Sequence, residues 1–484
     1  MEYEAVIGLE VHVQVKTESK IFSSVGVGFG AQPNSLTDPV VLGFPGVLPV
    51  INREAVEKSI KVGMLLNGSI PRVTKWDRKN YFYPDSPKNY QISQFDQPIC
   101  SGGELEIELK GPSRNVMGEH KTIALTRAHL EEDVGKLIHL ENESLVDFNR
   151  AGTPLLEIVS QPDMHTPEEA YAYLTALKML LIYGEVSDCD MEKGQLRCDA
   201  NVSVRPVGQK ELGVKVEIKN LNSISGVRNG LAYEIERQIQ VLEGGGTLAQ
   251  ETRGWDAAKG MTYHMRSKEE SHDYRYFPDP DLMPVRIDHQ WRDRLHASLP
   301  EKPFDRQRRY FDAYGLPYTL TSVLISDPEL CHFFEEAAKR AKRPRQAANW
   351  IVNNLLGELG RAGLTLSESK VFPDQIAQLV NLIGEGVISK NLAKERVFPE
   401  MFKTGDNPAA IVQARGLGQS ESAEDLEKIC SEIVQANPDA VAEVLSGNKK
   451  AINFLKGRVM RATRGKANPA LVGSLLEELI AEKG

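Results

Sequence analysis

The chain of 484 residues is poor in cysteine, in long apolar runs and in basic charge at its start. Its five cysteines are odd in number and form no CxxC pair, so we expect free thiols in a reducing compartment rather than a disulfide framework. The longest nearly apolar stretch, residues 40–51, is interrupted by two glycines and two prolines and predicts no membrane-spanning helix. Residues 1–4 are acidic and do not resemble a signal peptide, which favours a cytoplasmic protein.

The short motifs of common nucleotide and metal sites are missing as well. The sequence contains no GxxxxGK[ST] phosphate loop, and the glycines of residues 26–30 do not match GxGxxG. It contains no HExxH, and its cysteines lack the spacing of zinc ligands. Any nucleotide or metal site must therefore be assembled from residues that lie far apart in the chain.

The excess of negative over positive charge is also small. The chain has 58 Lys and Arg against 67 Asp and Glu, a net charge of −9. This balance excludes a protein that coats nucleic acid with its whole surface, but it allows one basic region. The apolar fraction of 41% is typical of a folded protein, and the length predicts two to four domains at about 100–200 residues each.

The sequence pattern changes twice along the chain. Residues 1–293 mix strand-like alternation, turns and a few helical stretches, which predicts an α+β domain. Residues 294–405 are helical in pattern. Residues 406–484 follow a strong turn signal and indicate several short helices.

The first domain is expected to contain sheets with one face covered by helices and one face open. Apolar periodicity predicts covering helices over residues 168–183 and 227–242. Alternation of apolar and polar residues predicts strands over residues 4–16, 196–204 and 214–220.

Acidic side chains fall on the polar sides of these strands. Alternation places Glu10 beside His12 on one side of the first strand. The same rule places Asp199 and Glu217 on the polar sides of the two later strands. If the strands share a sheet, these polar sides form one acidic face.

Two further acidic positions are less regular. Glu157 lies within an apolar run, where a carboxylate is costly to bury unless it is paired or bound to a metal. Near residues 125–133 the register leaves open whether Glu131 or Glu132 points inward. A convergent set would hold Mg²⁺ or Mn²⁺ through Glu10, His12, Glu132, Glu157, Asp199 and Glu217. Strand glutamates are usually just solvated, and alternation alone does not exclude that interpretation.

Cationic side chains occur close to aromatic ones in three segments. Lys79 lies in residues 77–85 and Arg275 in residues 274–281, both rich in Tyr and Phe, and Arg253 lies beside a tryptophan. Such side chains suit phosphate contacts with aromatic stacking. The alternative is a Pro-rich turn whose aromatics close the edge of a core, and composition alone favours it.

One segment near the C-terminus is strongly basic. Residues 446–466 contain seven basic residues and no acidic one, namely Lys449, Lys450, Lys456, Arg458, Arg461, Arg464 and Lys466. They would follow an RNA backbone, or they are a solvated helix face. No group of exposed aromatics is expected beside them, which favours recognition of backbone and shape over bases.

Six stretches together resemble GatB, the B subunit of the aspartyl/glutamyl-tRNA(Asn/Gln) amidotransferases. They are residues 4–14, 90–96, 146–155, 196–201, 219–223 and 274–278. The resemblance covers essentially the whole chain, and residues 457–469 are similar to a YqeY-type tail. It implies a cradle-shaped α+β catalytic domain on a mainly antiparallel sheet, then an all-helical domain, then a small helical tail domain.

The resemblance also implies a reaction and its participants. ATP would phosphorylate the side-chain carboxylate of Glu-tRNA(Gln), and often of Asp-tRNA(Asn), and ammonia would then displace the phosphate. The ammonia would come from glutamine through an amidase partner, the A subunit, and a small third protein, the C subunit, would complete a heterotrimer. The convergent set would hold Mg²⁺, with Glu10, His12 and Glu132 as catalytic residues. Lys79, Arg253 and Arg275 are assigned to ATP, and the basic tail segment to tRNA.

One departure from the family concerns zinc. Some members carry zinc-binding cysteines after the first strand, whereas residues 22–24 and 37–39 contain none here. We therefore expect no structural zinc, so packing must hold this loop. Two other functions remain alternatives: a non-catalytic tRNA-binding scaffold with structural carboxylates, and a free-standing ligase for small substrates, which the basic tail disfavours.

Overall fold

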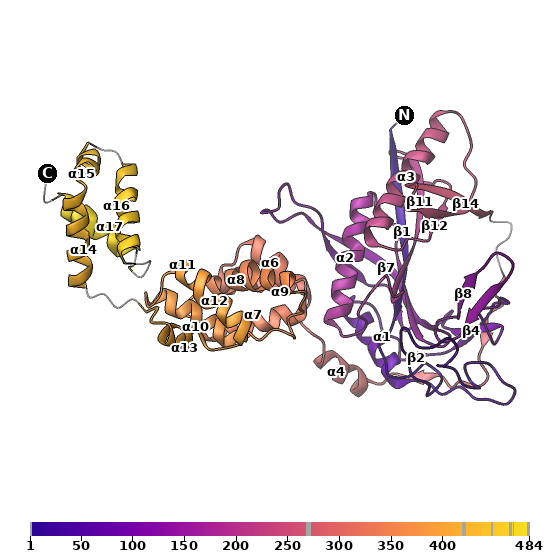
Figure 1. Cartoon of the computed structure of the whole chain (residues 1–484). Coiled ribbons are helices and arrows are strands. Elements are labelled where there is room, and N and C mark those ends of the chain that lie inside the picture. Colours follow the sequence, from indigo (N-terminus) through magenta and orange to yellow (C-terminus); the bar gives the residue numbers. More distant parts are fainter. Residues whose placement is uncertain are drawn as a thin grey trace. The chain divides into compact units, whose positions relative to one another are not determined.

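A computed structural model describes residues 2–267, 273–418, 423–446, 449–463, 467 and 469–481. Contacts divide the chain into two compact units, Met1–Asp305 and Arg306–Gly484. The first unit is built on sheets and the described part of the second on helices, which confirms the predicted α+β class (Figure 1). The finer division at residues 293 and 405 stays a prediction. No helix within the described ranges is both long and apolar enough to cross a membrane.

The first unit is organised around a nine-stranded sheet. Its order is β14-β13-β12-β11-β1-β10-β7-β5, with β6 paired to β7, and every pair is antiparallel except β12 with β13. The mainly antiparallel sheet is thus confirmed. The strands are β1 (Tyr3–Gln14), β5 (Cys100–Ser101), β6 (Glu104–Glu108), β7 (His120–Glu132), β10 (Pro154–Ser160), β11 (Leu196–Pro206), β12 (Val216–Lys219), β13 (Glu251–Asp256) and β14 (Met261–Ser267).

Two long helices cover one face of this sheet (Figure 1). They are α2 (Pro167–Tyr183) and α3 (Ile224–Glu243), and they lie where sequence periodicity predicts helices. Each begins at a hydroxyl cap: Thr166 accepts from the Glu169 N–H and Ser223 from the Gly226 N–H. Beneath them the apolar side of β1 is completely buried, as at Ile7 and Val11. The opposite face of the sheet is therefore the open one.

Small sheets and short helices complete the first unit. The three-stranded sheet is most relevant here, because its residues reach the end of β7. It contains β3 (Asp77–Asn80), β4 (Tyr90–Ser93) and β15 (Phe277–Pro278). The other elements are β2 (Val73–Thr74), β16 (Val285–Arg286), β8 (Lys136–His139), β9 (Ser144–Asp147), α1 (Arg53–Leu65) and α4 (His289–Ala297).

The long irregular segment after β1 is fastened by one buried lysine. The Lys20 side chain is fully buried, and its Nζ donates to the backbone carbonyls of Leu36 and Ala151 at 2.6 Å each. Burial lowers the pKa of Lys20 to about 8. The ammonium thus links segments more than a hundred residues apart in a loop that has no cysteine.

The described part of the second unit consists of helices. They are α6 (Tyr318–Leu324), α7 (Pro328–Arg340), α8 (Pro344–Trp350), α9 (Leu356–Ala362), α10 (Pro373–Gly384), α11 (Lys390–Leu392), α12 (Phe398–Thr404), α13 (Pro408–Ala414), α14 (Ala423–Ala436), α15 (Pro438–Leu445), α16 (Lys449–Ala462) and α17 (Pro469–Ala481), with π-helical turns at Ile351–Leu355 and Ala393–Val397. At the border of the units lies α5 (Pro303–Tyr314). Helices α14 to α17 share a core of their own around Leu455, Val459 and Leu476.

Candidate functional site

Strand register brings the acidic side chains together on the open face of the large sheet. On β1, Glu10 lies opposite Asp199 of β11, and His12 lies opposite Glu157 of β10. Glu217 of β12 is one strand further out, opposite Asn201. Side chains of directly opposed residues point to the same face. Five of the six residues proposed as metal ligands therefore share one face.

The tightest group consists of His12, Glu131 and Glu157. One ligand atom from each lies within 4.8 Å of the others, a spacing that fits a single metal ion. His12 Nε2 is 3.2 Å from a Glu157 oxygen, and His129 Nε2 lies 3.4 Å from the same oxygen. The second carboxylate, on Glu131, accepts a hydrogen bond of 3.0 Å from the Ser93 hydroxyl of β4. Carboxylate oxygens with one imidazole are ligands that suit Mg²⁺ or Mn²⁺.

The end of β7 resolves which glutamate joins this group. Glu131 lies two residues after His129, so both point to the Glu157 side. The Glu132 carboxylate instead pairs with Lys88 and accepts from the Ile92 N–H at 2.8 Å. The structure thus brings Glu131, and not Glu132, to His12 and Glu157.

The other acidic residues form a second group around a lysine. Lys219 Nζ lies 2.5 Å from Asp199 Oδ2 and 3.1 Å from Glu217 Oε1. Glu10 lies between the two groups and accepts from the Asn201 amide at 3.2 Å. In this second group a lysine lies between the two carboxylates, whereas in the first group two histidines lie beside Glu157.

The pKa directions report crowded negative charge. Burial, followed by the charges of Glu157, Asp199 and Glu217, raises the pKa of Glu10. Burial alone would lower the pKa of His12, but its hydrogen bond to Glu157 raises it. Burial would raise the pKa of Glu157, yet His129 and His12 hold it well below its usual range. A carboxylate fixed in its charged form beside another with a raised pKa is the arrangement that a divalent cation relieves.

The three residues assigned to ATP are placed differently from one another. Lys79 of β3 lies 3.8 Å from Glu131 Oε2 and faces the Tyr274 ring at 5.1 Å, so it borders the acidic group. Burial would lower the pKa of Lys79, but Glu131 raises it, and the ammonium stays charged. Arg275 is exposed in the neighbouring segment, with a backbone φ of 44° that a non-glycine residue rarely adopts.

Arg253 lies on the other face of the sheet. Its Cα is opposite Ile218, whose side chain is buried under the helices. Its guanidinium donates to Glu251 and Thr262 at 2.9 Å each and lies 3.5 Å from Glu234 of α3. This placement separates Arg253 from the acidic face and gives it a structural role.

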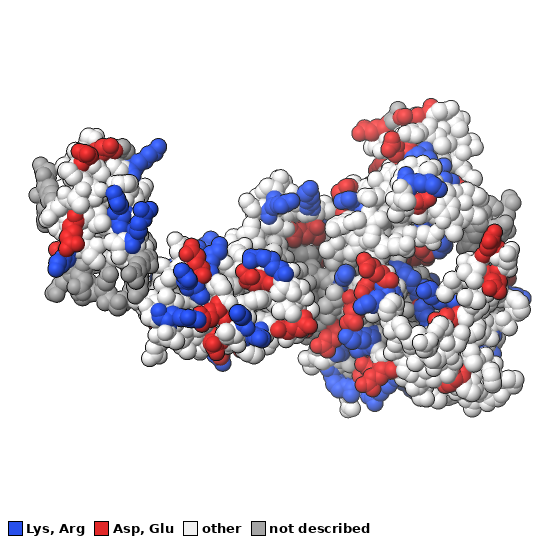
Figure 2. Space-filling model, in the orientation of Figure 1, with Lys and Arg blue, Asp and Glu red and all other residues white. Residues whose placement is uncertain are grey.

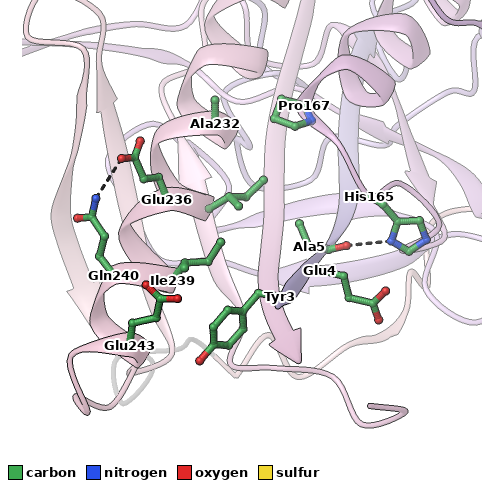
Figure 3. Close-up of a pocket in the computed structure, with 11 residues that line it drawn as sticks. Tyr3, Glu4, Ala5, His165, Pro167, Ala232, Glu236, Ile239, Gln240 and Glu243 are labelled. Atoms are coloured by element: carbon green, nitrogen blue, oxygen red, sulfur yellow. Dashed lines mark hydrogen bonds between the residues drawn. The ribbon is translucent and has the colours of Figure 1, made fainter. Parts of the chain in front are cut away.

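One pocket of the first unit lies away from the acidic face. Its volume is about 660 Å³, and it lies where α3 passes the start of β1 (Figure 3). Figure 3 shows His165 bonded to the Ala5 carbonyl and Gln240 to Glu236, so its polar groups are partly satisfied by one another. It contains none of the residues of the acidic groups.

The basic tail segment lies on α16. Lys450, Arg458 and Arg461 are exposed on one side of this helix, and blue side chains gather over it in Figure 2. Phe454 is 51% exposed on the same side, and Arg458 lies 5.4 Å from its ring. One exposed aromatic residue therefore lies beside the basic residues, where the sequence predicted no group of them. Arg464 and Lys466 lie outside the described residues, and Lys456 is half-buried.

Sequence comparison defines the class of the protein. Residues 5–293 match the model of the GatB/GatE catalytic domain, and residues 332–480 match that of the GatB domain. A protein of Opitutus terrae is 61% identical over 484 residues, covering 99% of this chain and 100% of that protein. A protein of Thermoanaerobacter pseudethanolicus is 50% identical over 483 residues, covering 100% of both chains. Both are named as the B subunit of an aspartyl/glutamyl-tRNA(Asn/Gln) amidotransferase.

The chain belongs to the GatB family, the B subunits of the aspartyl/glutamyl-tRNA(Asn/Gln) amidotransferases. The structure adds residues that sequence reasoning left out of the site: His129, Ser93 and Lys219. His129 and Lys219 each lie two residues from an acidic member on the same strand, so alternation contained the signal. Ser93 lies on another sheet, and no sequence pattern connects it to Glu131.

Proposed function

We propose that this chain is the component of the amidotransferase that activates the side-chain carboxylate of Glu-tRNA(Gln), Asp-tRNA(Asn) or both with ATP. A carboxylate oxygen attacks the γ-phosphorus, ADP leaves, and an acyl phosphate forms. Ammonia then attacks the carbonyl carbon, inorganic phosphate leaves, and the nitrogen loses a proton to give the amide. Membership in the family and the names of the relatives support this reaction.

One observation carries the proposal: five carboxylates and two histidines converge on an open sheet face, and their charges are not fully offset. His12, Glu131 and Glu157 are the residues that would hold Mg²⁺ or Mn²⁺. When bound, the cation would offset the repulsion between ATP and the substrate carboxylate. The donor chemistry fits, because magnesium prefers oxygen ligands.

The cationic side chains near the acidic face have a separate role in this proposal. Lys79 stays charged beside Glu131, and we assign it to an oxygen of the transferred phosphoryl group. Ser93 holds the Glu131 carboxylate in place through its hydroxyl. Arg275 follows Tyr274, whose ring faces Lys79, and we retain it as a contact for ATP.

The ammonia and the rest of the complex remain predictions of the family resemblance. We propose an amidase partner (the A subunit) that releases ammonia from glutamine, a small third protein (the C subunit) that completes a heterotrimer, and a cytoplasmic location. The exposed side of α16, with Lys450, Phe454, Arg458 and Arg461, is proposed to contact tRNA.

The test uses the full chain with ammonium chloride, Mg²⁺-ATP and Glu-tRNA(Gln). We expect ADP release and Gln-tRNA formation with the charged tRNA and not with uncharged tRNA. Recovery of turnover only after the two partner proteins are added would also support the proposal. Binding of tRNA without ATP turnover, even in the complete complex, would favour the non-catalytic scaffold.

A second experiment tests the tail. Replacing Arg458 or Arg461 by alanine is expected to weaken tRNA binding about 3- to 10-fold and to lower the salt dependence by roughly one phosphate contact. Lys428→Ala, on α14, serves as the charge-matched control. Equal effects of all three substitutions would contradict a specific contact by α16.

A further inference from the structure

A pocket in the second unit contains none of the residues discussed so far. Its volume is about 450 Å³, and α6, α8, α10 and α11 contribute to its lining. Asn353 joins them from the π-helical turn Ile351–Leu355. Small-molecule sites have volumes of about 300–1,000 Å³, so the pocket is large enough for a ligand of that kind.

The charged side chains of this pocket are positive. Arg345 and Lys390 are exposed at its lining, and no Asp or Glu is among the described residues that line it. No ion pair to either cation occurs in the described part of the chain. Arg345 also lies in the first turn of a continuous helical run, residues 344–362, where the helix dipole disfavours positive charge. The two charges are therefore not matched within the fold and are available to an anion.

The basic segment that leads into α8 shows what distinguishes Arg345. Residues 339–345 contain five Lys and Arg. Three of the five pair with carboxylates: Lys339 with Glu336, Arg340 with Asp374 and Lys342 with Glu385. An RNA backbone is followed by a row of cations that are free to contact successive phosphates. Because most of this segment is already paired, it favours a small anion at Arg345 over a track for RNA.

The uncharged part of the lining combines hydrogen-bonding groups with apolar ones. Gln346, Asn349 and Asn353 present three carboxamides, and none of these side chains makes a hydrogen bond within the described ranges. Leu320 and Trp350 also line the pocket and are buried. A carboxamide both donates and accepts, so the three groups suit the mixed donors and acceptors on the edge of a nucleobase. The apolar side chains suit its flat faces.

The backbone gives a second indication that is independent of charge. Asn353 lies within the π-helical turn Ile351–Leu355, and Lys390 lies three residues before the turn Ala393–Val397. Such turns are rare and are found frequently at functional sites. Two of them therefore adjoin the one pocket that carries unmatched cations and carboxamides.

We propose that this pocket binds a small phosphate ester, of the size of a nucleoside monophosphate. Arg345 and Lys390 contact the phosphate through charge-assisted hydrogen bonds. The three carboxamides contact the edge of the base. The site needs no divalent cation, because its own two cations match the charge of the phosphate. It goes beyond the proposed function, which assigns ATP to the acidic face and tRNA to α16.

Titration calorimetry of the full chain with AMP, in a chelator that removes divalent ions, tests the two cations. Arg345→Gln and Lys390→Gln are each expected to weaken AMP binding about 10-fold, because each removes a charge-assisted contact. Lys394→Gln is the charge-matched control, since Lys394 is exposed four residues after Lys390 and does not line the pocket. Glu157→Gln, on the acidic face, is also expected to leave AMP binding unchanged.

Ribose 5-phosphate, which lacks a base, tests the carboxamides. The unchanged chain is expected to bind AMP about 10-fold more tightly than ribose 5-phosphate, and Asn349→Ala and Asn353→Ala to reduce that preference. Both side chains are exposed, so thermal unfolding should stay the same. Asn391→Ala, an exposed asparagine of α11 outside the lining, is the control.

The outcomes separate this site from the acidic face and from RNA. Equal AMP binding by the unchanged chain and both cation variants would overturn the proposal, and so would the absence of AMP binding. Weaker tRNA binding in the Arg345 and Lys390 variants, without any binding of AMP, would assign the pocket to RNA instead. Loss of AMP binding in Glu157→Gln alone would place AMP on the acidic face and would also overturn the proposal.

Discussion

The central carboxylates on the two faces of the large sheet have different partners. On the helix-covered face, Glu234 is fully buried, accepts two hydrogen bonds from Arg237 at 2.6 and 2.9 Å, and accepts a third from Thr262. On the open face, the Glu157 carboxylate lies 3.2 Å from His12 and 3.4 Å from His129, and the pKa of Glu10, which lies among other carboxylates, is raised. A carboxylate matched to arginine is complete within the fold, whereas crowded carboxylates leave charge for a ligand to neutralise.

The largest effect is expected from a substitution on the open face that removes a charge and hardly changes the shape of the side chain. Glu157→Gln removes the charge that two histidines share, so we expect divalent-ion binding and ATP-dependent amide formation to fall at least about 100-fold. Mn²⁺ titration and Gln-tRNA formation measure the two effects. Glu236→Gln, on the exposed side of α3, is the control. Full activity of Glu157→Gln would remove the metal assignment.

The matching substitution on the covered face is expected to act on stability instead. Glu234→Gln leaves Arg237 and Arg253 without their buried partner, at a cost of about 3 kcal/mol in the free energy of unfolding. Denaturant unfolding measures this cost. Turnover per folded molecule should stay at the level of the unchanged chain, and a specific loss of turnover would show that the two faces are not separate.

A smaller effect is expected for Ser93, which lies outside the large sheet and supports Glu131. Ser93→Ala removes the hydroxyl that holds Glu131, and we expect Mn²⁺ affinity to fall about 10-fold with little change in unfolding. Ser86→Ala is a matched control, because its hydroxyl is buried nearby but bonds at 3.4 Å to a backbone carbonyl. The same Mn²⁺ affinity in both variants would deny Ser93 this role.

The smallest expected effect compares pH dependence on the two faces. The pKa of Glu10 is raised in the folded chain, so ionisation of Glu10 lowers the free energy of unfolding as pH rises through that value. Glu10→Gln should therefore stabilise the chelator-treated chain at pH 7. Burial would raise the pKa of Glu251, but His264 and Arg253 lower it, so its charge stabilises at neutral pH. Glu251→Gln should therefore destabilise. Each change is on the order of 1 kcal/mol and should fade below the ordinary glutamate pKa.

Thermal unfolding from pH 2 to pH 8 measures both variants. Opposite signs at pH 7 that converge in acid are the expected result. The same sign for both would mean that the two faces share one electrostatic character, and the comparison would fail.

Local patterns predicted the parts of the site that depend on one strand. Alternation sufficed to place Glu10 and His12 on one side of β1, and apolar periodicity located α2 and α3, whose first residues the caps then fixed. The choice between Glu131 and Glu132 depends on how the end of β7 pairs with Pro154 and Leu155 of β10. That register is not local, so the sequence left it open.

Local sequence patterns could not predict the sheet face on which Arg253 lies, for a similar reason. Its face is set by the parallel pairing of β13 with β12 in a sheet that is otherwise antiparallel. The residues between these strands form α3, which supplies Glu234 as the partner of Arg253. A cation beside an aromatic residue looks the same in sequence whether it meets phosphate or a buried glutamate.

Lys20 has a practical consequence for following motion in this molecule. An amine that is fully buried and donates to carbonyls of Leu36 and Ala151 cannot react with acylating reagents while those contacts last. Its modification rate, relative to the exposed Lys16 four residues earlier, therefore reports how often the loop after β1 opens. The modification rate of this one lysine, measured by mass spectrometry, thus reports local unfolding of the loop without any label introduced by mutation.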